Sequence, residues 1–147
     1  MTLLEQLRED HREAKDLLAQ IENAEDSKDC GTLFREFRSK LLAHAHAEQK
    51  TLYEPMQRDE EHRDTMLEAT VEHQVAEDLI EQLSRARPKG TPEWRAKCTV
   101  LKEMLEHHIE EEEGEVFQAA REMFEQEQLE EMAQKFERLK ERELKVA

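Results

Sequence analysis

The chain has 147 residues, of which 40% are charged and only 5% aromatic, and its formal net charge is −15. This negative charge disfavours nucleic acid and anionic membrane surfaces as partners, because both are negatively charged themselves. Good helix formers dominate, with only three glycines and three prolines, so we expect an all-α protein. A chain of this length can bury a core, and we expect residues 1–147 to form one domain.

The sequence gives no sign of export or membrane insertion. We find no apolar run long enough to span a bilayer, and the N-terminus lacks the basic start and apolar block of a signal peptide. The two cysteines, Cys30 and Cys98, lie far apart and form no CxxC motif. We expect two reduced thiols in a cytoplasmic protein.

The first predicted helix starts at a capping box formed by Thr2 and Glu5. Its apolar residues recur with helical period, and His11 lies on the same stripe. The stripe is Leu3, Leu7, Ala14, Leu17, Leu18 and Ile21. This helix is expected to fade near 26–29.

The second helix is expected to begin at Gly31 or Thr32, and Pro55 to end or kink it. Its inner ridge changes from apolar to metal-ligand type without a break in spacing. The ridge is Phe34, Phe37, Leu41, His44, Glu48 and Leu52.

Two further helices follow a charged connector at 59–64. The third, at about 64–85, carries His73 on its inner stripe with Glu77 beside it. After a loop at 87–92, Thr91 and Pro92 start the fourth helix as N-cap and first helical residue. Trp94 is expected to anchor its first turn, and Gly114 to weaken it further on.

These helices predict an up-down antiparallel four-helix bundle over about 2–124, with an additional C-terminal helix at about 127–144. The last helix has Leu129, Met132, Phe136 and Leu139 at steps of three and four. It either packs across the bundle or mediates a homodimer.

Each bundle helix places one histidine on its inner stripe, and three of these histidines have a glutamate four residues later. The histidines are His11, His44, His73 and His108, and the glutamates are Glu48, Glu77 and Glu112. Residues four apart share a helix face, so both donors of a pair point into the core. Imidazole and carboxylate groups suit iron, manganese or zinc. Four histidines with two glutamates between them would form a dinuclear site inside the bundle.

Plainer interpretations apply to single members of this set. Some His–Glu pairs arise by chance in a glutamate-rich chain, and one histidine on an apolar face is usually a hydrogen-bonded core residue. It is hard to provide hydrogen-bond partners in the core for four such histidines, one on each helix. His46 lies about 200° around the helix from His44, and His62 lies in the connector, so we expect both to be solvated. Tyr53 could contribute to the site, but we expect its side chain to pack at the edge of the site instead. A ferritin-like site needs Glu-x-x-His, which is absent from the sequence.

The ordered motifs resemble the hemerythrin-like, or HHE cation-binding, proteins. The matching pieces are Asp10-His11-Arg12, His44-Ala-His-Ala-Glu48, Leu52-Tyr53-Glu-Pro55, Glu72-His73 and His108 to Glu113 leading to Val116-Phe117. This resemblance implies two non-haem iron ions. His11 and His44 would bind one and His73 and His108 the other, while Glu48, Glu112 and an oxo or hydroxo group would bridge them.

Glu77 stands where the oxygen-carrying members have a second histidine in the third helix. As a negative ligand it would favour the ferric state and disfavour reversible oxygen carriage. We therefore expect a di-iron protein that binds, senses or reacts with oxygen, peroxide or nitric oxide. A catalase- or peroxidase-like enzyme and an iron-holding or iron-donating module are the alternatives.

Overall fold

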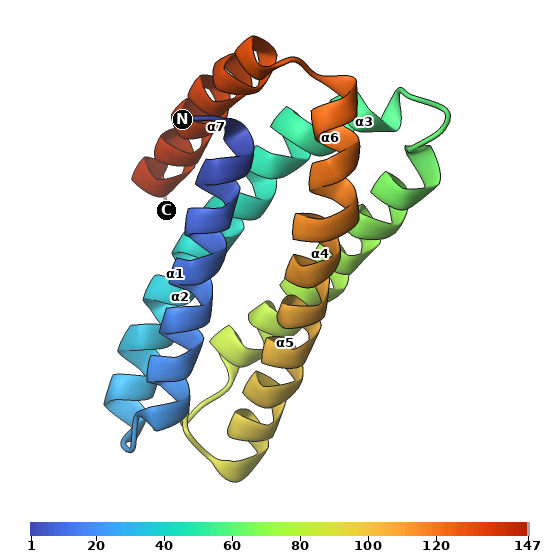
Figure 1. Cartoon of the computed structure of the whole chain (residues 1–147). Helices are drawn as coiled ribbons and strands as arrows, with labels where there is room; N and C mark the ends of the chain where they lie inside the picture. The colour runs from blue at the N-terminus through green and yellow to red at the C-terminus, as the bar shows by residue number, and fades with distance from the viewer. Residues whose placement is uncertain (147) are drawn as a thin grey trace.

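The structure, a computed structural model that describes residues 1–146, is an up-down bundle of long helices (Figure 1). The four bundle helices are α1 (Leu3–Asn23), α2 (Ser27–Glu48), α4 (Arg63–Arg85) and α5 (Pro92–Glu111). Two of them continue through π-helical turns: α2 through η1 (Gln49–Tyr53) into α3 (Glu54–Gln57), and α5 through η2 (Glu112–Val116) into α6 (Phe117–Met123). The part of the chain described contains no strand. The predicted all-α bundle with an additional C-terminal helix is confirmed.

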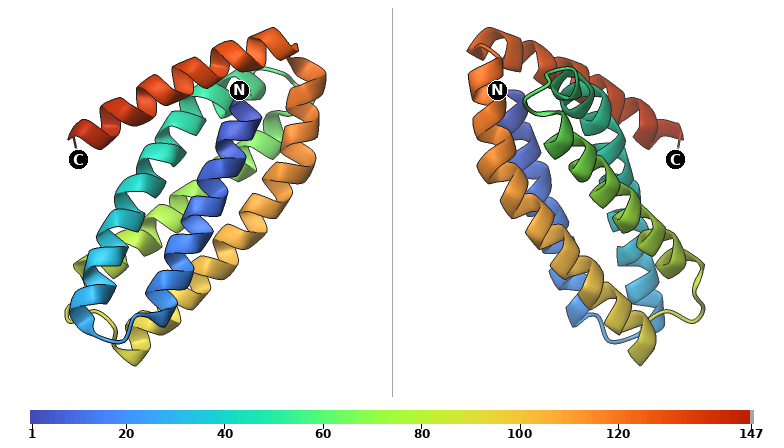
Figure 2. Two further views of the ribbon diagram at one scale, coloured as in Figure 1. Left: turned by 60° about the vertical axis from the view of Figure 1, so that its left-hand side comes forward. Right: turned by 90° about the vertical axis from the view of Figure 1, so that its right-hand side faces the viewer.

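The C-terminal helix α7 (Gln126–Val146) lies across one end of the bundle, over α1 and α2 (Figure 2). Leu129, Ala133 and Phe136 are buried there and join a core cluster with Leu3 and Leu7 of α1. Of the two roles left open for this helix, packing across the bundle is therefore the one observed. The homodimer stays a prediction.

The caps predicted for the first and fourth helices are present. Thr2 and Glu5 form the capping box of α1. The Thr91 hydroxyl accepts a hydrogen bond from the Trp94 amide at 3.1 Å, and the Trp94 indole donates to the Leu83 carbonyl at 3.1 Å. Trp94 is buried, so it anchors the start of α5 in the core as expected.

The predicted start of the second helix was wrong, and its end lies two residues beyond Pro55. The helix begins at Ser27 because the carboxylate of Asp26 caps it, accepting a hydrogen bond from the Asp29 amide at 2.8 Å. The chain also stays helical past Pro55, to Gln57. Pro55 is the second residue of α3 and closely follows the π-helical turn η1.

The apolar core is divided into two clusters, one at each end of the bundle. The cluster beneath α7 includes Leu7, Leu52 and Phe117, and the opposite cluster includes Phe37 and Leu105. Along each helix, the inner histidine falls between residues of the first cluster and residues of the second. The bundle therefore has a polar layer at mid-height between two apolar ends.

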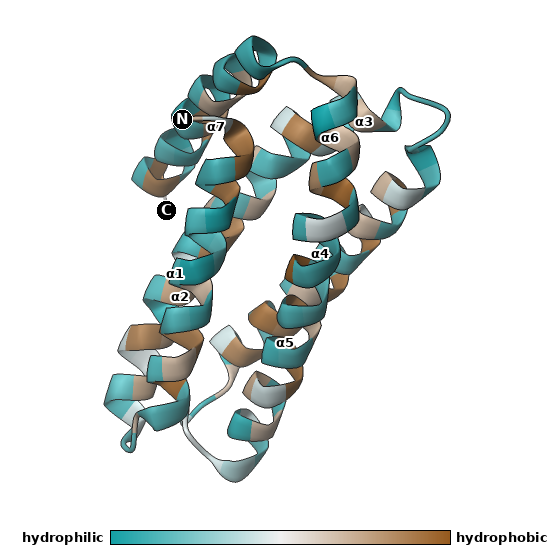
Figure 3. Cartoon of the chain, viewed as in Figure 1, coloured by the Kyte–Doolittle hydropathy of each residue, from teal (hydrophilic) through white to brown (hydrophobic). Residues whose placement is uncertain are grey.

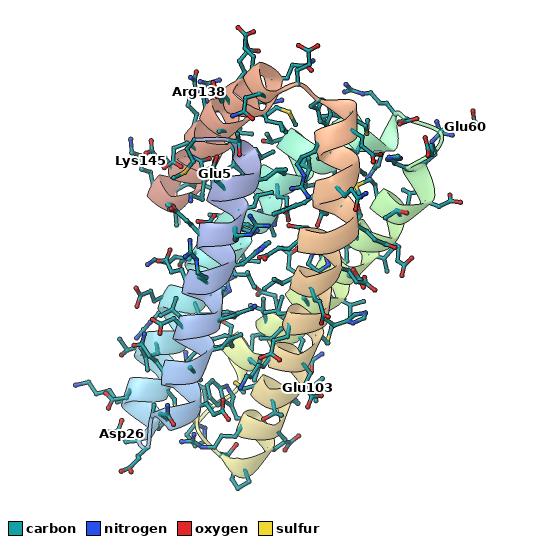
Figure 4. All side chains as sticks on the ribbon, viewed as in Figure 1. Glu5, Asp26, Glu60, Glu103, Arg138 and Lys145 are labelled. Carbon is teal, nitrogen blue, oxygen red and sulfur yellow. The ribbon has the colours of Figure 1, made fainter. Side chains whose placement is uncertain are left out.

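Hydrophilic residues cover much of the outward-facing helix surface (Figure 3). Charged side chains such as Asp26, Glu60 and Lys145 extend from the periphery (Figure 4). None of the helices described is long and apolar enough to cross a membrane.

Candidate metal centre

The structure brings six of the seven predicted site residues together in the polar layer. The first group consists of His11, His44, Glu48 and Glu112, and the second consists of Glu48, His73, His108 and Glu112. Within each group the candidate ligand atoms all lie within 4.8 Å of one another. The two glutamates belong to both groups, so the arrangement has two compartments with a shared wall of carboxylates.

Each histidine directs its Nε2 atom at a shared carboxylate. His11 Nε2 lies 3.2 Å from Glu112 Oε1, and His44 Nε2 lies 3.6 Å from Glu48 Oε1. On the other side, His73 Nε2 lies 3.2 Å from Glu48 Oε1, and His108 Nε2 lies 3.2 Å from Glu112 Oε2. The membership of the groups is the one that the resemblance implies for two metal ions.

The two shared carboxylates are buried without adequate hydrogen bonds, which is the observation that fits a cation. Glu48 is fully buried and Glu112 is 1% exposed. Both oxygens of Glu48 and Oε1 of Glu112 have no hydrogen-bond partner within residues 1–146. Burying a charged carboxylate costs much free energy unless the carboxylate is paired with a positive charge or coordinates a metal. Imidazole and carboxylate donors together suit iron, manganese or zinc.

The pKa shifts of the two glutamates also indicate that a positive charge would stabilise the site. Burial raises the pKa of Glu48 well above its usual range, and the Glu112 carboxylate adds to the rise. Burial also opposes ionisation of Glu112, but Glu48, His108 and His11 hold its pKa well below the usual range. Two adjacent buried carboxylates do not both ionise readily without a counter-charge. Metal ions bound between them would supply that charge.

The other ring nitrogen of three histidines donates to an acidic residue of a different helix. His44 Nδ1 donates to Asp10 at 2.8 Å, His11 Nδ1 to Glu113 at 2.7 Å, and His108 Nδ1 to Glu72 at 2.8 Å. Such outer carboxylates fix the tautomer and orientation of a metal-binding imidazole and leave Nε2 free to bind. Sequence reasoning missed this role of Asp10, Glu72 and Glu113. The available signal was that each is adjacent in sequence to a site residue.

Asp10→Asn is expected to weaken metal binding about 10–100-fold, the usual effect of losing an outer carboxylate. The amide fills the same space but no longer provides a charged acceptor for His44 Nδ1. Affinity is measured by competition with a chelator. Asp16→Asn is the matched control, since Asp16 lies on the same helix, is exposed and contacts Gln20. Equal affinity in both variants would show that Asp10 does not support the site.

Glu77 is the predicted site residue that the structure does not bring into either group. Its Oε1 lies 3.0 Å from His46 Nε2, and its side chain is 38% exposed. His46 also donates from Nδ1 to Glu143 of α7 at 2.5 Å. His46 is exposed, as predicted, but it links α2, α4 and α7 at the surface. A ligand role for Glu77 stays a prediction that this side-chain position does not favour.

Two further expectations about side chains near the site were wrong. Tyr53 is not at an edge: it is fully buried, and its hydroxyl lies 3.0 Å from His108 Nε2. The side chain of His62, the N-cap residue of α4, is only 14% exposed. His107 behaves as its helical phase predicts, with a side chain that is 65% exposed. Cys30 and Cys98 are free thiols.

Comparison with known families agrees with the motifs. A family model described as the hemerythrin HHE cation binding domain matches residues 2–120. The chain belongs to the hemerythrin family. The match covers the whole bundle and every residue of the two groups, so this hemerythrin domain is a metal-binding module.

The chain is also similar to a curated protein from Nostoc sp. named DNA nickase, at 27% identity over 140 residues. The match covers 95% of the chain but 39% of the relative, so the chain spans well under half of the relative's length. No solved structure matches the chain.

Helix α7 lies beyond the region matched by the hemerythrin family but reaches the outer partners of the site. Lys140 Nζ contacts both carboxylate oxygens of Asp10, at 3.0 and 3.1 Å. The Phe136 ring packs edge-on against His44, with centroids 5.7 Å apart. In this hemerythrin domain the C-terminal helix therefore helps to hold the His44 side of the centre.

Proposed function

We propose that the chain is a non-haem di-iron protein that binds, senses or reacts with oxygen, peroxide or nitric oxide. The observation that carries this proposal is the pair of buried carboxylates, Glu48 and Glu112. Each belongs both to the group of His11 and His44 and to the group of His73 and His108. Two carboxylates shared between two imidazole pairs suit two metal ions that are close enough to act together. Two bound iron ions would exchange electrons with a small ligand.

The side chains of the site have separable tasks. The Nε2 atoms of His11, His44, His73 and His108 would bind the ions. Glu48 and Glu112 would bridge them and balance their charge. Asp10, Glu72 and Glu113 hold the imidazoles in the tautomer that leaves Nε2 free to bind.

A cavity of about 130 Å³ adjoins the two groups and supports access by a small, weakly polar ligand. It touches all four histidines and Glu48, and its remaining wall is mainly apolar. The apolar lining includes Leu17, Leu18, Phe37, Ile80, Leu105 and Ile109. A mainly apolar wall of this kind would admit a diatomic ligand to the two groups.

The proposal predicts two iron ions per purified chain and charge-transfer absorption in the near ultraviolet. Mixing the anaerobically reduced protein with oxygen, peroxide or nitric oxide is expected to change the spectrum at once for at least one of them. Metal analysis and stopped-flow spectroscopy provide the measurements. One zinc ion per chain with no such absorption would rule out the di-iron assignment. Two iron ions with no response to any of the three ligands would favour the iron-holding alternative.

We do not extend the DNA nickase activity of the Nostoc relative to this chain. The formal net charge of −15 repels a phosphate backbone, and most of the relative lies outside the match. A catalase- or peroxidase-like enzyme remains within the proposal, since it would use the same centre and the same small ligands.

A further inference from the structure

The hydroxyl of Tyr53 lies among the candidate ligand atoms of the second group. It is 3.0 Å from His108 Nε2 and 3.2 Å from His73 Nε2, and it donates a hydrogen bond to Glu112 Oε2. The residue is fully buried, with its ring 4.9 Å from the His73 ring, centroid to centroid. The phenol oxygen therefore lies beside the imidazole and carboxylate atoms that could bind a metal ion.

The π-helical turn η1 explains how Tyr53 reaches this position. Tyr53 follows Glu48 by five residues, which in a regular α-helix would place the two side chains about 140° apart. In a π-helix the hydrogen bonds run between residues five apart, so such residues come close to the same face. The Glu54 amide donates to the Gln49 carbonyl, which is a bond of this kind. Single π-helical turns inside α-helices occur frequently at functional sites.

The predicted site includes one further donor for the second group. The sequence assigns that place to Glu77, but the Glu77 carboxylate bonds to His46 at the surface. The phenol oxygen of tyrosine is a hard donor and is known to bind iron in haem proteins. In the structure the phenol donates its proton to a hydrogen bond with Glu112, and a bound ferric ion would attract the phenol oxygen instead.

We propose that the phenol oxygen of Tyr53 is a ligand of the iron held by His73 and His108. This inference rests on the di-iron function proposed above and adds one donor to it. On binding, the O–H bond breaks, an oxygen lone pair forms the bond to iron, and the proton leaves to solvent. The anionic oxygen stabilises the ferric state, which is the effect that the sequence attributes to Glu77. The two irons would then differ, because the tyrosine hydroxyl lies beside His73 and His108, the histidines of the second group.

The optical spectrum of the iron-loaded full chain tests the inference. Phenolate bound to ferric iron gives a charge-transfer band in the visible and enhanced phenolate ring modes in the resonance Raman spectrum. Tyr53 is the one tyrosine in the sequence, so either signal identifies it without a variant. We expect Tyr53→Phe to lose the visible band while iron content changes little.

Thr51→Val is the matched control, because Thr51 lies in the same turn and its buried hydroxyl has no hydrogen-bond partner within residues 1–146. It should keep both band and iron. Iron-loaded protein without a visible band, or a Tyr53→Phe variant that keeps the band, would overturn the tyrosine ligand and leave the di-iron site standing. A chain that binds no iron would overturn both. If Tyr53→Phe does not fold, the Raman spectrum of the unaltered chain decides.

Discussion

Removal of the metal is expected to lower the free energy of unfolding by about 4 kcal/mol when the free metal stands at a thousandfold excess over its dissociation constant. For a chain of this size that corresponds to a fall of roughly 8–16 °C in the melting temperature. The physical reason is that metal-free protein keeps Glu48 and Glu112 in the core with carboxylate oxygens that lack hydrogen bonds. Thermal unfolding followed by circular dichroism, with and without a chelator, measures the difference.

Glu48→Gln provides the internal control for this prediction. Because burial and the neighbouring Glu112 carboxylate disfavour ionisation of Glu48, a neutral amide at this position should not destabilise the metal-free protein. The same change removes a carboxylate that would bridge the metal ions, so the gap between metal-bound and metal-free melting temperatures should shrink. Identical melting of the two forms of the unaltered chain would be inconsistent with a metal site in the core.

Replacing His108 with alanine is expected to release most of the metal, whereas replacing His107 should release none. The two residues are neighbours on α5, but His108 is 8% exposed and faces Glu112, while the side chain of His107 is 65% exposed. His108→Ala removes a proposed metal ligand, so its effect should exceed the about 10–100-fold loss typical of an outer partner.

Iron content after desalting, with circular dichroism to confirm folding, measures this effect. His44→Ala should behave like His108→Ala, because His44 Nε2 faces the other shared carboxylate. Similar losses from His107→Ala and His108→Ala would mean that binding occurs on the surface.

The sequence predicted the bundle well because its signals are local and periodic. Apolar residues at steps of three and four set the inner faces, and residues such as Thr2 and Thr91 set the starts of helices. The start of the second helix was misplaced because the capping side chain of Asp26 lies in a polar stretch that reads as a loop. Gly31 was therefore predicted as the start of the helix, although it lies inside the helix.

The inner stripes also predicted which histidines and glutamates come together, with Glu77 as the exception. Glu77 shares a helix face with His73, but it has a partner in His46 at the surface. Helical phase fixes the side of the helix on which a residue lies. Helical phase does not decide whether the side chain finds its partner in the core or at the surface.

The outer partners and Tyr53 were beyond such reasoning for two different reasons. Asp10, Glu72 and Glu113 bond to histidines of other helices, so the relation depends on how the helices pack. Tyr53 enters the site because η1 is π-helical, and a regular helical phase directs it elsewhere. The same departure occurs in η2, which begins at Glu112, so both shared glutamates border a π-helical turn.

Anomalous X-ray scattering from crystals of the purified protein, recorded on both sides of the iron absorption edge, tests the central claim most directly. The account predicts two iron peaks between Glu48 and Glu112, one beside His11 and His44 and the other beside His73 and His108. A single peak, a peak among exposed acidic residues, or a signal that does not change across the iron edge would contradict it.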